Sequence, residues 1–131
     1  YTAEAEVKSL PKSDRPFAHL PQPENLTDES FAKDVIEASK SKPVLVKFTA
    51  PWCHPCKVLQ PVLDEIDTQI PRLKILKADS AQNIKAMSDF EVMGVPTLIL
   101  FRQGQPAKER LVGLKNKKEI LQYIVTHSSE S

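Results

Sequence analysis

The stretch "PWCHPC", residues 51–56, contains the only tryptophan and the only two cysteines of a 131-residue chain. Two cysteines three positions apart can form a crosslink, hold part of a metal site or exchange disulfides with other thiols. A bridge between Cys53 and Cys56 closes so short a loop that it restricts the unfolded chain little. Small secreted disulfide scaffolds also need more than two cysteines. The pair is therefore not there for stability.

The position of the pair favours thiol chemistry. Cys53 follows a short β-rich segment and opens a predicted helix, where the partial positive charge and free N–H groups favour a thiolate. The spacing i, i+3 sets Cys56 over the same helix face, where it can attack a mixed disulfide formed at Cys53. Pro55 lies in the first turn, where its missing N–H costs nothing. The pattern indicates a dithiol that exchanges disulfides.

Two other interpretations of the cysteines are weaker. They could be two small buried apolar residues, but this would not explain their place at a helix start. A zinc site needs a second pair of ligands, and the remaining candidates His19, His54 and His127 lack metal-like spacing. We expect no metal.

The bulk composition excludes several classes of partner. With 40% apolar and 27% charged residues, the chain resembles an ordinary globular protein of one domain. A net charge of +1 argues against nucleic acid or an anionic membrane as the main partner. No apolar run approaches the roughly 18 residues that span a bilayer.

Hydrophobic patterns around the cysteines predict alternating strands and helices. Residues 43–50, "PVLVKFTA", read as a buried central strand that is apolar but for Lys47. A second strand is predicted over 72–79 and a short helix over 81–90, and residues 96–101 and 108–113 flank a hairpin turn around Gly104. The helix from Cys53 to Gln69, kinked by Pro61, should bury Val58, Leu59, Val62, Leu63 and Ile66.

Two further helices are predicted nearer the ends of the chain. The first starts at Thr27 or Asp28, and its apolar face is formed by Phe31, Val35 and Ile36. The last starts at Asn116 with Glu119 as the reciprocal cap, and its apolar stripe is formed by Ile120, Leu121, Ile124 and Val125. Together these elements predict an α/β domain with a mixed sheet.

Residues 1–24 differ from the rest of the chain. They combine charges, scattered prolines and few large apolar groups, so we expect an N-terminal extension or linker, followed by one domain over residues 25–131. The proline-rich leader resembles a spacer behind a cleaved signal or a lipid anchor. We therefore expect a periplasmic, envelope or secreted protein, with the cytoplasm as the alternative.

The motif W-C-x-P-C-K at 52–57, with G-V-P-T at 94–97 and "VGLKNKKEI" near the end, resembles the thioredoxin family over about residues 25–126. The resemblance implies the thioredoxin fold, a central mixed β-sheet flanked by helices. It also implies a protein-disulfide oxidoreductase without a bound cofactor. Expected partners are protein thiol or disulfide substrates and an upstream redox partner, and the chain should be a monomer.

The resemblance also implies roles for single residues. Cys53 would be the exposed nucleophile and Cys56 the buried resolving thiol. Trp52 would pack beside the site and shield the sulfurs, although simple core packing is the alternative.

Two later positions complete the implied site. Pro96, after Val95, matches the family's cis-proline, which faces the cysteines and docks substrate backbone. Gly113 matches the glycine that leaves a groove for a substrate chain, although a strand-end turn would also explain it.

The chain departs from the family pattern at two positions. His54-Pro55 replaces the usual Gly-Pro, and His54 can add positive charge beside Cys53 unless it is simply solvated. Lys47 stands where the family usually has a buried aspartate that handles the proton of the resolving thiol. A lysine there favours nearby thiolates, unless it pairs with an acid or extends to solvent along the sheet. Lys57 matches the family's usual lysine and should lie on the rim.

These departures favour an oxidising site, because a more stable thiolate stabilises the reduced form. The leading hypothesis is a thiol–disulfide oxidoreductase acting on proteins through its CHPC dithiol. The alternatives are a thioredoxin-fold binding module with incidental redox activity, and a metallochaperone or assembly factor.

Overall fold

The computed structural model describes residues 25–128. The predicted extension, residues 1–24, lies outside the described residues, as do residues 129–131. The described part of the chain contains a six-stranded sheet in the order β1-β3-β2-β4-β5, with β6 also paired to β4. The strands are β1 (Asn25–Leu26), β2 (Val44–Thr49), β3 (Lys74–Asp79), β4 (Thr97–Arg102), β5 (Gln105–Pro106) and β6 (Leu111–Val112).

The sheet is mixed, as the sequence predicts. Strand β3 runs parallel to both β1 and β2, whereas β4 is antiparallel to β2, β5 and β6. Strand β2 therefore lies at the centre, between β3 and β4, and its end leads directly into the cysteine motif.

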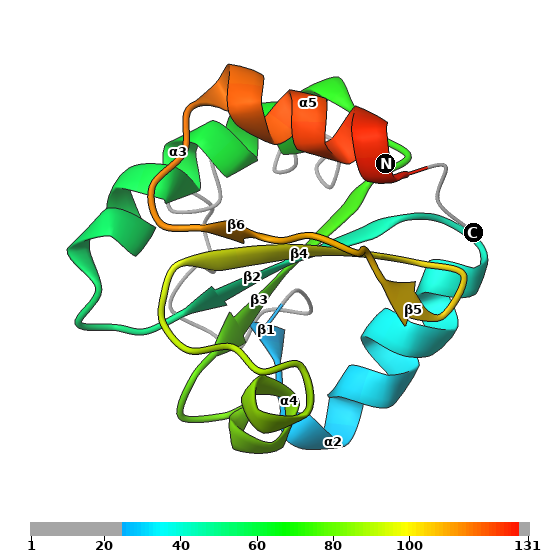
Figure 1. Cartoon of the computed structure of the whole chain (residues 1–131), viewed down its shortest axis with the longest axis vertical. Coiled ribbons are helices and arrows are strands. Elements are labelled where there is room, and N and C mark those ends of the chain that lie inside the picture. Colours follow the sequence, from blue (N-terminus) through cyan, green and yellow to red (C-terminus); the bar gives the residue numbers. More distant parts are fainter. Residues whose placement is uncertain (1–24, 129–131) are drawn as a thin grey trace, which may run out of the picture.

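Helices cover both faces of the sheet and give three layers (Figure 1). One face carries α3 (His54–Gln69) and α5 (Lys117–His127). The other carries α4 (Ile84–Asp89) and α2 (Asp28–Phe31), which continues as a π-helical turn (Ala32–Glu37) and a 3₁₀ turn (Ala38–Lys40). This is the predicted α/β architecture.

Alternation along β2 divides the core in two. Val44, Val46 and Phe48 belong to the core beneath α2 and α4, whereas Leu45 belongs to the core beneath α3 and α5. Side chains two apart share a face of a strand, so Lys47 points to the same side as Leu45, toward α3.

The first predicted helix is shorter and less regular than expected. Thr27 is its N-cap, and the reciprocal partner is Ser30, whose hydroxyl accepts from the Thr27 N–H at 3.0 Å. Phe31 and Val35 are buried as predicted. Strand β1 was not predicted, because two residues carry no periodicity and only pairing with β3 defines them.

Two predicted helix faces were partly wrong. Val58 on α3 is 44% exposed and Val125 on α5 is 72% exposed. On α5 the buried positions include Tyr123, which suits burial because its hydroxyl accepts from the Leu100 N–H at 3.0 Å and donates to the Glu109 carbonyl at 2.7 Å. An apolar count cannot identify a polar residue that finds its partners only in the folded sheet.

The predicted turn at Gly104 is present between β4 and β5. Gln103 and Gly104 both have positive φ, 54° and 77°, which is the backbone of a two-residue type I′ hairpin.

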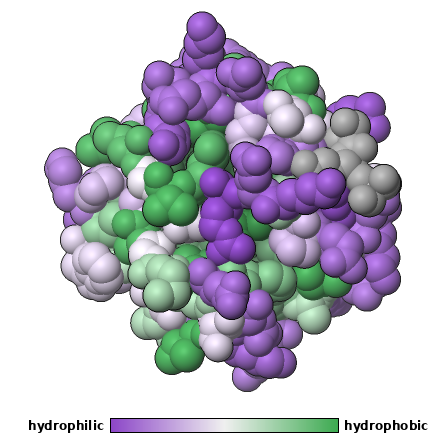
Figure 2. Space-filling view, in the orientation of Figure 1, coloured by the Kyte–Doolittle hydropathy of each residue, from purple (hydrophilic) through white to green (hydrophobic). Residues whose placement is uncertain are grey.

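The surface seen in the orientation of Figure 1 is mostly polar, as the ordinary content of charged residues suggests. Figure 2 shows hydrophilic residues spread over this face, with hydrophobic ones in smaller areas between them. Among residues 25–128, no helix combines the length and the apolar character needed to cross a bilayer.

Candidate active site

The cysteine pair lies where β2 passes into α3. Cys53 is the N-cap of α3, and its N–H donates to the Ala50 carbonyl at 3.1 Å. Its Sγ accepts a hydrogen bond from the Cys56 N–H at 3.2 Å. The two cysteines form a disulfide, with their Cα atoms 5.3 Å apart. A sulfur in this place meets both the helix dipole and a backbone donor, and both stabilise negative charge on it.

The expectation that Cys53 is exposed was wrong for this disulfide state. Cys53 is 3% exposed and Cys56 is 1% exposed. The sulfur of Cys53 turns inward to bond Cys56, and the pair packs with Ala50 and Val95.

The alternative that Trp52 is a core residue was wrong. Trp52 is 78% exposed. Val95, on the loop that enters β4, packs against the disulfide. An aromatic ring beside the cysteines is left open to a binding partner.

The loop before β4 and the residue after β6 meet beside the disulfide. The Val95–Pro96 peptide bond is cis. The Gly113 N–H donates to the Pro96 carbonyl at 2.9 Å. Gly113 has φ +88°, and a Cβ built on it would point into open space. Glycine therefore serves the backbone turn here, and the missing side chain leaves the surface next to Pro96 open.

Lys47 lies beneath α3 and does not extend to solvent. It is 3% exposed, and its Nζ donates to Gln60 Oε1 at 2.5 Å and to the Cys56 carbonyl at 3.3 Å. Gln60 Nε2 in turn donates to Asp64 Oδ1 at 2.7 Å. In this chain of bonds the Gln60 amide lies between the Lys47 ammonium and the Asp64 carboxylate.

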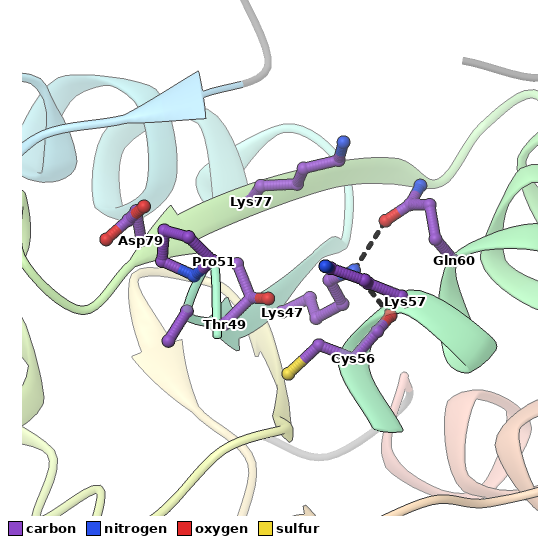
Figure 3. A pocket seen from close by; sticks show the side chains of 9 residues that line it. Lys47, Thr49, Pro51, Cys56, Lys57, Gln60, Lys77 and Asp79 are labelled. Carbon is purple, nitrogen blue, oxygen red and sulfur yellow. Dashed lines mark hydrogen bonds between the residues drawn. The ribbon is translucent and has the colours of Figure 1, made fainter. Parts of the chain in front are cut away.

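A pocket of about 230 Å³ opens beside this lysine. Figure 3 shows Lys47 reaching from β2 toward Gln60 and Cys56 on α3, with Lys77 on the neighbouring strand β3. Lys77 is the register partner of Lys47. The pocket thus brings lysines of two strands to the side of Cys56.

The remaining predicted residues lie at the start of α3. His54, Pro55 and Lys57 are all exposed, with His54 and Pro55 in the first helical turn. Lys57 also lines the pocket, which agrees with its predicted place on the rim. Across residues 25–128 no group of three or more His, Cys, Asp or Glu residues could hold a metal ion.

The comparisons with known proteins agree with this geometry. The thioredoxin family model matches residues 22–126. This chain belongs to the thioredoxin family. Over 97 residues it is 50% identical to a thioredoxin of Mycobacterium bovis, covering 73% of this chain and 81% of that protein. It is 40% identical over 101 residues to a thioredoxin of Rickettsia felis, covering 76% of this chain and 93% of that protein.

A third relative has a longer chain. A bifunctional thioredoxin reductase/thioredoxin of Mycobacterium leprae is 47% identical over 97 residues, covering 73% of this chain and 20% of that protein. Family membership and the bonded cysteine pair together make this protein a thiol–disulfide oxidoreductase of the thioredoxin type, acting on protein disulfides.

Within this thioredoxin site, sequence reasoning missed four residues around Lys47: Gln60, Asp64, Lys77 and Asp79. A signal existed for the first two, because they lie four and eight positions after Cys56 on the same helix stripe. No sequence signal pointed to Lys77 and Asp79, since the register between β2 and β3 follows only from the assembled sheet.

Proposed function

We propose that Cys53 is the nucleophile of this oxidoreductase and Cys56 the resolving thiol. The Cys53 thiolate attacks a substrate disulfide, forms a mixed disulfide and releases one substrate thiolate. Cys56 then loses its proton and attacks Cys53 Sγ, which forms the intramolecular disulfide and releases the second substrate thiolate. The observation that carries this assignment is the hydrogen bond from the Cys56 N–H to Cys53 Sγ at the start of α3.

We propose that substrate chains dock across Trp52, Val95, Pro96 and Gly113. Exposure of the Trp52 ring, contact of Val95 with the disulfide and the open surface at Gly113 support this. An extended peptide seated there would lie beside the sulfur that it must reach.

We propose a reductase as the upstream redox partner. The name of the Mycobacterium leprae relative, a reductase and a thioredoxin in one chain, supports this pairing. We also propose that the chain acts as a monomer, and that it has no need of a cofactor, since the dithiol carries both electrons.

We propose an envelope, periplasmic or secreted location. The proline-rich composition of residues 1–24, compatible with a spacer, supports it. Fractionation of cells that express the whole gene product tests the proposal, and recovery of the protein in the cytoplasm alone would contradict it.

Trapping of substrates tests the roles of the cysteines. Cys56→Ser should accumulate mixed disulfides with protein substrates through Cys53, because no second thiol resolves them. Cys53→Ser is the matched control and should trap none. Equal trapping by the two variants would reverse or reject the assignment, and failure of the unmodified protein to reduce insulin would favour the binding-module alternative.

A further inference from the structure

The residues that hold Lys47 form one row on α3. Cys56, Gln60 and Asp64 are each four positions apart, and side chains at this spacing lie above one another on a helix. Cys56 is 1% exposed and Asp64 is 7% exposed, so both ends of the row are buried, and Gln60 between them is half-buried. Its bonds run from the Asp64 carboxylate through the Gln60 amide to the Lys47 ammonium and on to the Cys56 carbonyl.

Each bond in this row fixes the next. An amide side chain can present either its oxygen or its nitrogen, and the Asp64 carboxylate accepts only from the nitrogen. The Gln60 oxygen is thereby turned to Lys47, which it meets at 2.5 Å. Lysine is a flexible side chain, so without this acceptor its ammonium could leave the site beneath Cys56 for the open pocket.

We infer that Gln60 and Asp64 are positioning residues that hold the Lys47 cation against Cys56, where it stabilises the Cys56 thiolate that resolves the mixed disulfide. The inference rests on the proposed roles of the two cysteines. In the resolving step the Cys56 proton passes to solvent through the pocket, a bond forms between the two cysteine sulfurs, and the bond from Cys53 to the substrate breaks. The released substrate thiolate takes up a proton from solvent.

Other charged groups lie around Cys56, and each is more exposed than Lys47 or farther from Cys56. His54 and Lys57 on α3 are exposed, and water screens them. Lys77 and Asp79 on β3 are half-buried and oppose one another in sign along the same pocket. Asp64 lies eight residues along α3, which corresponds to about 12 Å at 1.5 Å per residue. Lys47 alone among these contacts the Cys56 backbone in the hydrogen bonds described.

Asp64 could act on Cys56 in two ways, directly through its charge or indirectly by positioning Lys47. If the carboxylate acted directly by its charge, Asp64→Asn would favour the Cys56 thiolate. If it acts by positioning Lys47, the same change disfavours the thiolate. The sign of the effect therefore decides between them.

A two-step reaction with a chromogenic aromatic disulfide measures both cysteines in the full-length reduced protein. Attack by Cys53 on bis(3-carboxy-4-nitrophenyl) disulfide releases one coloured thiol, and attack by Cys56 on the resulting mixed disulfide releases the second. Stopped-flow absorbance over a pH series gives a rate for each release. Cys56→Ser should show the first release alone.

Lys47→Met should slow the second release about tenfold at neutral pH and move its pH midpoint up by about one unit, as expected for loss of one nearby positive charge. Gln60→Met and Asp64→Asn should slow it about threefold, with the same sign. The first release should change less than the second in each variant, and its presence shows that the variant is folded. Lys47→Arg should restore most of the rate, because arginine keeps the charge and cannot act as a base.

A double variant separates positioning from a general structural effect. Lys47→Met with Asp64→Asn should be no slower than Lys47→Met alone, because Asp64 acts through Lys47. Glu65→Gln is the matched control, since it removes a carboxylate from the exposed side of α3, and it should leave both releases unchanged. Additive effects, or a faster second release in Asp64→Asn, would overturn the inference. Absence of the first release in the unmodified protein would reject the proposed function instead.

Discussion

Position 47 places a lysine ammonium, 3% exposed, beside the first turn of α3. Position 54 places an imidazole at the exposed start of the same helix. Both side chains are found where positive charge favours thiolates, so we expect these two residues to adjust the redox balance of the site. The backbone donor to Cys53 Sγ acts in the same direction.

We expect this protein to be more oxidising than an ordinary thioredoxin, whose potential is about −270 mV. Stabilising the thiolate by about 1 kcal/mol raises the potential by roughly 20 mV, since 30 mV corresponds to about 1.4 kcal/mol. Lys47→Asp should lower the potential by at least this amount. His54→Gly should lower it by on the order of 10 mV, because solvent screens an exposed charge.

Equilibration with a glutathione buffer measures these potentials, and thiolate absorbance against pH tests their cause. Lys57→Gly removes a charge from the pocket rim and serves as the control, with a smaller change than Lys47→Asp. An unmodified potential at or below about −270 mV would contradict the expectation.

At the scale of the element, caps determine where the helices begin. Thr27 and Asn116 both act as N-caps with a reciprocal partner three residues on, and Cys53 is itself the cap of α3. Because Cys53 is the N-cap, its sulfur necessarily lies at the start of α3. The third capping site, on α5, lies away from the cysteines and so reports on stability alone.

Asn116→Ala should destabilise the protein by about 1 kcal/mol, because the Glu119 N–H loses its acceptor at 2.8 Å. The melting temperature should fall by about 3–5 °C without loss of activity. Asn116→Asp keeps the acceptor and should melt within about 1 °C of the unmodified protein. Thermal unfolding followed by circular dichroism makes the comparison, and equal melting of the alanine and aspartate variants would show that this cap does not contribute.

At the scale of the whole molecule, the sheet assembles the site from distant segments. Strand β2 supplies Lys47, the loop before β4 supplies Val95 and Pro96, and the residue after β6 supplies Gly113. The domain also includes β1, because Leu26 is buried and its carbonyl accepts from Asn83 Nδ2 at 2.8 Å. The edge strand thus belongs to the folded unit, whose family match begins at residue 22.

A chain that begins at Glu24 should melt within a few degrees of the full chain, since residues 1–24 contain few of the apolar groups that offset ordering entropy. A chain that begins at Asp28 should lose about 2–4 kcal/mol, because it also lacks buried Leu26 and its bond to Asn83. Differential scanning calorimetry of the three lengths measures this. A large loss in the first truncation would show that the extension stabilises the domain.

The sequence by itself determined the architecture and the reacting pair. Local patterns were sufficient for this, because strand β2 is apolar but for Lys47 and Thr49, Cys53 and Cys56 are one helical turn apart, and each cap of α2 and α5 has its partner three residues on. The resemblance to the thioredoxin family also identified Lys47 as the unusual residue of the site, since the family usually has an aspartate at this position.

Only the tertiary structure decided which residues surround the sulfurs and Lys47. Exposure of Trp52, burial of Cys53 under Val95, and the bonds from Lys47 to Gln60 and Cys56 depend on how α3 packs against β2. Such contacts join residues that are distant in sequence or are set by helix rotation, and neither follows from a local pattern. Disulfide exchange by the pair was therefore readable in the sequence, whereas the electrostatic environment of Cys56 follows from packing.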